Sequence, residues 1–170
     1  QVIHIMFDTS DVRPSGALIK GFGGVASGPG PLTEMLSAVS ATLLDSFLVG
    51  GKLSPLGAMS IDHEIAACVV SGNVRRSARM SILHWKSDSI FDFIACKADA
   101  SKHWSTNISV EVDNDFWAAV NAGNKHALSV LDKISTGMLR NGEPGFYNSS
   151  LASIGENGDV RCTNPCGEIT

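Results

Sequence analysis

Three residues near the end of the chain carry the side chains best suited to chemistry. Asn164, Cys166 and Glu168 bring together an amide, a thiol and a carboxylate. In an extended backbone, alternate side chains point to the same side, so this spacing predicts that the three groups converge on one small volume. Pro165 and Gly167 lie between them, and both are poorly suited to the middle of a sheet. The pattern therefore favours a stiff loop that projects into a cavity.

This trio suits redox or radical chemistry on a hydroxylated substrate. The thiol of Cys166 can donate a hydrogen atom or become a thiyl radical. The carboxylate of Glu168 can accept a proton from a neighbouring hydroxyl, and the amide of Asn164 can hold a second oxygen by hydrogen bonds.

Other roles for the same residues remain open. Cys166 could be a small buried apolar residue, with Glu168 a surface charge. A cysteine-dependent hydrolase or transferase would need a histidine within reach of the thiol, and none is near in the sequence. A zinc site through Cys162 and Cys166 lacks a second Cys/His pair at a suitable distance.

Composition narrows the class of protein. Hydrophobic residues make up 44% of the 170 residues and charged residues 18%, as in folded proteins. The net charge is -4, and Arg75-Arg76 is the single basic cluster, so no nucleic-acid partner is expected. No apolar run approaches the roughly 20 residues of a membrane helix, so no membrane partner is expected. Four cysteines without a secretory signal favour reduced thiols and a cytoplasmic location.

The ends of the chain suggest a part of a longer protein. The chain starts at Gln1, and it stops at Thr170 directly after its most informative motif. Domain ends usually lie in exposed polar segments. We therefore expect a fragment.

Strands and helices are expected to alternate, which predicts the α/β class. Residues 8–31 form a long loop rich in glycine and proline. The expected strands are 1–7, 78–85, 107–112 and 145–148, and the expected helices are 32–49, 61–70, 88–97, 115–122 and 126–139.

The sequence from Asn164 to Ile169 (Asn-Pro-Cys-Gly-Glu-Ile) resembles the active-site loop of ribonucleotide reductase large chains. Three further segments, in the same order, resemble the monomeric adenosylcobalamin-dependent (class II) ribonucleoside-triphosphate reductases. They are residues 7–14 with 21–29, residues 72–78 and residues 141–145. The resemblance covers essentially the whole chain. It implies a ten-stranded α/β barrel, of which residues 1–170 would form about the first half, with the loop at 163–169 through its centre.

The resemblance also implies roles for individual residues. Cys166 would become the thiyl radical that removes the 3′ hydrogen of the ribose, Glu168 would be the base for the 3′ hydroxyl, and Asn164 would orient the ribose hydroxyls. The product would be a deoxyribonucleotide, from a ribonucleoside di- or triphosphate, with adenosylcobalamin as cofactor in the full-length enzyme. Two further cysteines of the full enzyme would deliver reducing equivalents from a thioredoxin-type reductant. Both would lie outside this chain, so Cys68, Cys96 and Cys162 are not given this role.

Two loops gain a regulatory meaning from the resemblance. Residues 8–31 would be the first specificity loop, beside a bound dNTP effector, and residues 72–78 the second, between effector and substrate base. Glycine-rich backbone can approach phosphate, and arginine can pair with phosphate or stack on a base. The candidate substrate or effector contacts are Arg13, Lys20, Asn73, Arg75, Arg76 and Ser77. The plainer alternatives are a surface loop and two solvated arginines at a helix end.

Two alternative functions stay open. Class I large subunits, which rely on a separate radical-generating subunit, share the Asn-x-Cys-x-Glu arrangement. A nucleotide-binding module without turnover would also use the glycine-rich loop and the arginine pair. The expected partners are a ribonucleotide, a dNTP effector, a thioredoxin-type reductant and the rest of the reductase chain. We expect the isolated chain to be inactive, because half a barrel leaves a sheet edge open.

Overall fold

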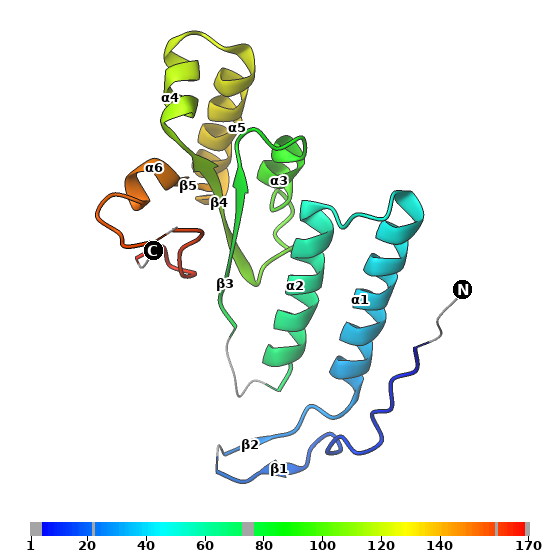
Figure 1. Cartoon of the computed structure of the whole chain (residues 1–170). Helices are drawn as coiled ribbons and strands as arrows, with labels where there is room; N and C mark the ends of the chain where they lie inside the picture. The colour runs from blue at the N-terminus through cyan, green and yellow to red at the C-terminus, as the bar shows by residue number, and fades with distance from the viewer. Residues whose placement is uncertain (1–4, 22, 73–76, 159, 169–170) are drawn as a thin grey trace. The chain divides into compact units, whose positions relative to one another are not determined.

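The computed structural model describes residues 5–21, 23–72, 77–158 and 160–168. The chain divides into two compact units, residues 1–77 and residues 78–170 (Figure 1). Each unit is described by itself.

The first unit begins with an irregular segment and a small hairpin. Strand β1 (Leu18–Ile19) pairs antiparallel with β2 (Gly24–Val25) inside the predicted loop. The strand predicted over residues 1–7 is wrong where it can be judged: residues 1–4 lie outside the described residues, and residues 5–7 form no strand and are exposed. A strand needs a hydrogen-bonded neighbour, and the described part of this unit pairs β1 only with β2.

Two helices complete the first unit. Helix α1 (Gly30–Val49) has a proline in its first turn and ends at Gly50, as predicted. Helix α2 (Pro55–Val70) begins earlier than predicted, because Ser54 caps it: the Ser54 hydroxyl accepts a hydrogen bond from the Gly57 N–H at 3.0 Å. A Cβ at Gly57 would lie 3.0 Å from the side chain of Leu53 and 3.2 Å from the Ser54 hydroxyl, so the first turn of α2 leaves little room for a side chain here.

Helix α1 is long and apolar on average. By length and composition alone it would be able to cross a membrane, which corrects the expectation that no segment is long enough. This is weak evidence, because apolar helices of soluble proteins pass the same test. Glu34 and Asp45 both lie within the helix, and α1 packs against α2.

The second unit confirms the α/β class. Strands β3 (Arg79–His84), β4 (Thr106–Val112) and β5 (Gly145–Asn148) form a parallel sheet in the order β3-β4-β5. The connections carry α3 (Ile90–Ala95), α4 (Asn114–Asn121) and α5 (Lys125–Asn141), and α6 (Ser149–Ala152), which was not predicted, follows β5. The predicted strands and helices of this unit all occur, with ends shifted by a few residues or fewer.

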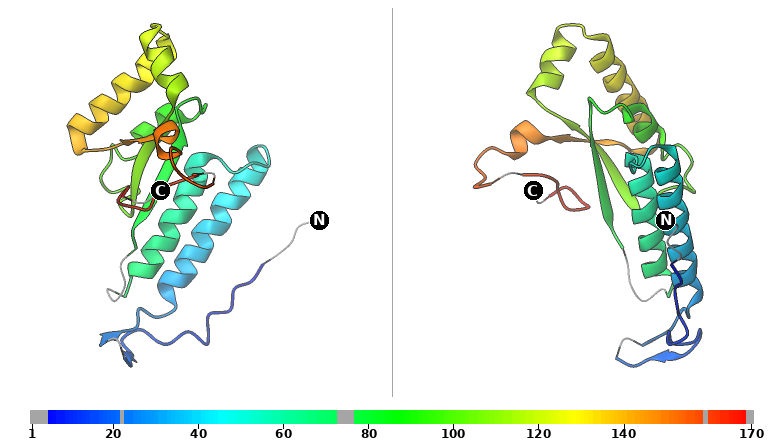
Figure 2. Two further views of the ribbon diagram at one scale, coloured as in Figure 1. Left: turned by 60° about the vertical axis from the view of Figure 1, so that its left-hand side comes forward. Right: turned by 45° about the vertical axis from the view of Figure 1, so that its right-hand side comes forward.

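The two faces of strand β4 differ in polarity. Ile108, Val110 and Val112 of β4 are at most 2% exposed and share one face with the buried side chains of α3 and α5. Figure 2 shows these helices on one side of the sheet and the C-terminal segment on the other. The side chains between the apolar residues of β4 (Asn107, Ser109 and Glu111) therefore face the C-terminal segment.

The turn after α5 is stabilised by polar contacts with other segments of the second unit. Glu143 forms an ion pair with Lys97, and its Oε1 accepts a hydrogen bond from the Ile108 N–H at 3.3 Å. The Lys97 Nζ also donates to the Thr106 carbonyl at 2.6 Å. Gly142 ends α5 with φ +83°, a conformation that favours glycine. The segment at residues 141–145, which carries one of the resemblances, thus joins the end of α5 to the start of β4 through the contacts of Glu143.

Candidate functional site

The segment that carries Asn164, Cys166 and Glu168 crosses the polar face of the sheet. The Asn107 side-chain amide of β4 donates a hydrogen bond to the Pro165 carbonyl at 2.8 Å, across 58 positions of sequence. This bond fixes the position of the loop relative to β4.

The backbone of this loop is a turn rather than an extended segment. The Gly167 N–H donates to the Asn164 carbonyl at 3.0 Å, and Gly167 has φ +82°. Pro165 takes the second position of the turn, which its fixed φ suits. The prediction of a loop in place of a central strand is confirmed, but the every-other-residue alternation used to bring the three side chains together is wrong.

Cys166 and Glu168 are both exposed, whereas Asn164 is half-buried. The Thr163 hydroxyl lies 3.4 Å from the Asn164 Oδ1 and can donate to it. Within the described residues, the thiol and the carboxylate are therefore not enclosed in the cavity that the sequence predicted. The thiol is accessible to a reactant that approaches the loop.

Sequence reasoning missed two residues on the face beneath this loop. Glu111 of β4 and Tyr147 of β5 are paired in register. Tyr147 is only 7% exposed, and its hydroxyl has no hydrogen-bond partner among the described residues. Burial raises the pKa of Tyr147, and the nearby charges of Glu111 and then Cys162 raise it further. The alternation of polar residues in 106–112 was visible in the sequence, but such a face is normally assigned to solvent.

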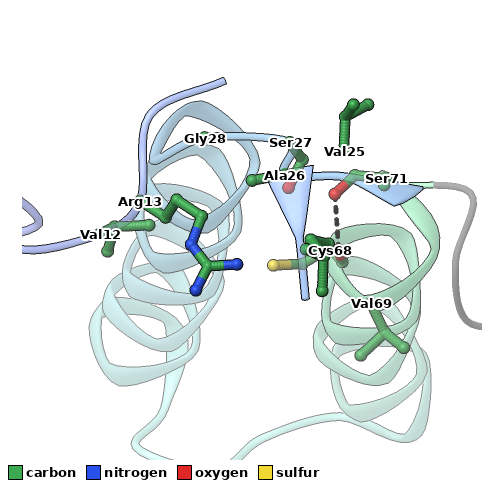
Figure 3. Close-up of a pocket in the computed structure, with 11 residues that line it drawn as sticks. Val12, Arg13, Val25, Ala26, Ser27, Gly28, Cys68, Val69 and Ser71 are labelled. Carbon is green, nitrogen blue, oxygen red and sulfur yellow. Dashed lines mark hydrogen bonds between the residues drawn. The ribbon is translucent and has the colours of Figure 1, made fainter. Parts of the chain in front are cut away.

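A second candidate site is a pocket in the first unit. Its cavity is about 370 Å³, and Figure 3 shows the Arg13 side chain extending into it, with Cys68 on the wall formed by α2. The Arg13 guanidinium donates to the Leu18 carbonyl at 3.3 Å, which holds it against the hairpin. The lining also includes Ser27, Ser71 and Gly72.

The shape of this pocket depends on Gly28. This residue is buried with φ +81°, and a Cβ there would lie 2.9 Å from the backbone nitrogen of Ser15. Residues with side chains rarely adopt this conformation, and none would fit the space. The glycine-rich composition of the loop thus has a specific steric cause at this position.

Of the predicted effector contacts that the structure describes, Arg13 lines this pocket, and Lys20 and Ser77 do not. Arg13 and Gly72, from the two predicted loops, line the same pocket. Lys20 is exposed on the hairpin and is not among the residues that line it. Ser77, within the second predicted loop, is half-buried. Asn73, Arg75 and Arg76 lie outside the described residues.

Comparisons with known proteins point to one kind of enzyme. Residues 1–43 match the family model described as the insertion domain of B12-dependent ribonucleotide reductase. The chain is 48% identical to the "Putative adenosylcobalamin-dependent ribonucleoside-triphosphate reductase" of Mycobacterium phage D29, over 97% of the chain and 26% of that protein. It is 40% identical to the adenosylcobalamin-dependent ribonucleoside-triphosphate reductase of Lactobacillus leichmannii, over 98% of the chain and 22% of that protein.

A solved structure agrees with these relatives. The crystal structure of a B12-dependent (class II) ribonucleotide reductase matches with a TM-score of 0.69 and 37% identity. The match covers 93% of this chain and 21% of that protein. The chain thus spans about a quarter of the length of the relatives it matches.

Proposed function

We propose, from the similarity of nearly the whole chain to adenosylcobalamin-dependent ribonucleoside-triphosphate reductases, that the chain is a segment of such an enzyme. The reaction is the reduction of ribonucleoside triphosphates to deoxyribonucleotides. The observation that carries this proposal is the match over 97% of the chain to one such enzyme and over 100% of the chain, and so over the loop with Cys166, to that of Lactobacillus helveticus. The class I alternative is less favoured, because the relatives and the solved structure carry names of the B12-dependent class.

In this proposal each of the three loop residues has a separate role in the reaction. Cys166, as a thiyl radical, takes the 3′ hydrogen of the ribose, and Glu168 accepts the proton of the 3′ hydroxyl. Asn164 orients the ribose hydroxyls through its amide. Loss of the 2′ hydroxyl as water follows. Reducing equivalents come from a thioredoxin-type reductant through cysteines elsewhere in the full enzyme.

Adenosylcobalamin, when bound in the full enzyme, supplies the radical that starts the reaction. The group that this chemistry needs from the present chain is an accessible thiol, and the exposed Cys166 at a tethered turn fits that need. We assign no cobalamin contact to this chain.

The proposed surroundings of the loop are those of a barrel. The β3-β4-β5 sheet is parallel, and one of its faces is covered by helices, as in half of a ten-stranded α/β barrel. Strands from the rest of the reductase chain would extend the sheet and enclose Cys166 and Glu168. A cytoplasmic location is in keeping with the four free cysteines.

The test uses the full-length reading frame that contains these residues. Cys166→Ser is expected to reduce turnover of ribonucleotides by at least 1,000-fold, roughly the 4 kcal/mol scale of losing an essential reacting group. Cys162→Ser, an exposed thiol four positions earlier, is the matched control and should keep most of the activity. Cobalamin-dependent turnover that survives Cys166→Ser would refute the assignment of the radical.

A second function, dNTP binding without chemistry, is favoured by the pocket that contains Arg13. We propose that residues 8–31 and 72–78 bind the deoxynucleotide effector, with Arg13 at a phosphate or base and Asn73, Arg75, Arg76, Ser77 and Lys20 as further candidates. Titration of the 170-residue chain with dNTPs should show saturable binding that Arg13→Gln weakens by about tenfold, as expected for one charge-assisted hydrogen bond. Arg140→Gln, in the second unit, is the control for the change in net charge. Binding that Arg13→Gln leaves unchanged would argue against this site.

A further inference from the structure

The face of the β3-β4-β5 sheet that carries Asn107 has a row of three polar side chains near the carboxyl ends of the strands. His84, Glu111 and Tyr147 occupy matching positions on the three strands, since His84 pairs with Glu111 and Glu111 with Tyr147. In parallel α/β sheets, ligands bind beyond the carboxyl ends of the strands. The row is thus in a place where ligand contacts are expected.

Two of the three side chains in this row have no hydrogen bond within the described part of the chain. The ring of His84 is occupied on both sides, by Asp113 at 3.2 Å and by the Lys86 N–H at 3.1 Å. The hydroxyl of Tyr147 is buried without a partner, which costs free energy unless another group completes the hydrogen bond. Glu111 pairs with Tyr147 across the two strands, whose backbones run about 4.8 Å apart.

The charge of this pair restricts the group that it can bind. A carboxylate accepts hydrogen bonds, and a phenol can donate one. A phosphate would be repelled by Glu111, which disfavours the anionic part of a nucleotide. A neutral group with both a donor and an acceptor can satisfy the carboxylate and the hydroxyl together.

Position along the strand adds a second restriction. The loop is tethered at Asn107, and Glu111 lies four residues farther along β4, roughly 13 Å in a strand. This distance runs from the tether and not from Cys166. Because Glu111 and Tyr147 form no hydrogen bond with the loop within the described residues, we give them a role in recognition rather than in bond breaking.

We propose that Glu111 and Tyr147 bind a neutral donor–acceptor group of the nucleotide substrate, either the edge of the base or a sugar hydroxyl. Glu111 accepts a hydrogen bond from this group, and Tyr147 donates one to it. Both are positioning residues. This inference rests on the proposed function, because it takes the ligand to be the nucleotide on which Cys166 acts.

A first experiment tests the contact between the two residues. Tyr147 is the only tyrosine among the 170 residues, so its ionisation can be followed by ultraviolet absorbance without interference. The phenol should titrate above its ordinary value, and Glu111→Gln should move the midpoint to lower pH, because it removes a negative charge that opposes ionisation. Glu143→Gln, which alters a carboxylate paired with Lys97, should not move it. A midpoint that is unchanged in Glu111→Gln would remove the pair on which the proposal depends.

The deciding experiment measures equilibrium binding in the full-length Cys166→Ser protein, so that it does not depend on turnover. Dissociation constants are compared for four ribonucleoside triphosphates and their 2′-deoxy counterparts, with and without Tyr147→Phe. If the pair binds the base, Tyr147→Phe should reduce the ratio between the largest and smallest dissociation constants of the four bases by about tenfold. The reduction should be equal for the ribose and the 2′-deoxyribose series. If it binds a sugar hydroxyl, the preference for ribose over deoxyribose should shrink instead. The control is Phe146→Leu, whose side chain points to the opposite face.

The failures of the two proposals can be told apart. A Tyr147→Phe protein with unchanged selectivity, or one in which all ligands weaken equally, would overturn the role of the pair. Turnover that persists in Cys166→Ser would overturn only the assigned chemistry. Absence of any nucleotide binding would overturn both.

Discussion

At the scale of single residues, Asp113 shows how one carboxylate organises the end of a strand and the start of a helix. Its Oδ1 accepts hydrogen bonds from the Phe116 N–H at 2.7 Å and from the indole N–H of Trp85 at 3.0 Å. Its Oδ2 lies 3.2 Å from the Nε2 of His84. Burial opposes the charge, but these hydrogen bonds outweigh it and leave the pKa of Asp113 below its ordinary value.

We expect Asp113→Ala to destabilise the chain by about 2 kcal/mol at pH 7, from the lost helix cap and the unpaired indole N–H. Because the folded-state pKa is lowered, the charged carboxylate contributes stability above its unfolded pKa of about 4, and this contribution is lost as the pH falls through the folded value. Urea denaturation measured between pH 7 and pH 3 checks both points.

Asp113→Asn is the matched control, because asparagine is a good cap and keeps an acceptor for the indole. The difference in the free energy of unfolding between the wild type and Asp113→Asn should become smaller below pH 4. A difference that stays constant with pH would show that the carboxylate charge is not what stabilises this corner.

At the scale of elements, periodicity in the sequence predicted most of the second unit. The strand at 145–148 matches β5 at both ends, because the left-handed Gly142 marks the end of α5 and the strand follows at once. The start of α2 was predicted six residues too late, at residue 61, because apolar spacing alone does not include the capping signal of Ser54 followed by Pro55. The strand at residues 1–7 was predicted from composition, which cannot supply a pairing neighbour.

The segment around Cys166 shows the same limit of local rules. Asn164-Pro165-Cys166-Gly167 has the residue types of a β-turn, and the structure follows these in preference to strand alternation. The tether from Asn107 could not be predicted, because it joins segments 58 positions apart. Glu111 and Tyr147 were missed because their proximity depends on the register of β4 and β5.

Gly137 of α5 provides a prediction at this scale. Alanine would favour the helix by about 1 kcal/mol by propensity alone. Its Cβ, however, would lie 2.5 Å from the Glu143 carbonyl oxygen and 3.0 Å from Pro144. Because overpacking costs about 1–3 kcal/mol, we expect Gly137→Ala to destabilise the chain and to loosen the contact between Glu143 and Ile108.

Gly142→Ala separates this clash from backbone strain. Nothing lies within 4 Å of a Cβ at Gly142, so its cost of about 1 kcal/mol would come from φ +83° alone. Hydrogen exchange of the Ile108 amide should accelerate in Gly137→Ala and change little in Gly142→Ala. Equal protection in the two variants would contradict the clash.

At the scale of the whole molecule, the hydrophobic core is divided unequally between the two units. Among the described residues of the first unit the buried hydrophobic ones are Met59 and Ala66, whereas the second unit contains Phe93, Phe116, Ile108, Ile134 and others. Several large apolar side chains of α1 are exposed, among them Phe47, Leu48 and Val49 at 74%, 70% and 89%. The first unit thus has little internal burial to resist opening.

We therefore expect residues 78–170 to fold as an isolated piece and residues 1–77 to be only marginally stable. Hydrogen exchange on the 170-residue chain should show amides of β4 and α5 protected at least 100-fold more than those of α1 and α2, or about 2.7 kcal/mol. Circular dichroism of the two separate pieces provides an independent check. Equal protection in the two units would mean that burial within each unit does not govern local stability.

The tether between Asn107 and Pro165 also links the loop that carries Cys166 to the correct alignment of the sheet. If β4 slipped by one residue, every side chain would exchange faces: Asn107 would turn towards the helices, and Ile108 would lie beneath the loop. The loop would then lose its anchor at the same moment that polar groups entered the core. The turn with Cys166 can therefore take its observed position only when β4 is in its native register. In a fold with a shifted register, Cys166 would lie elsewhere.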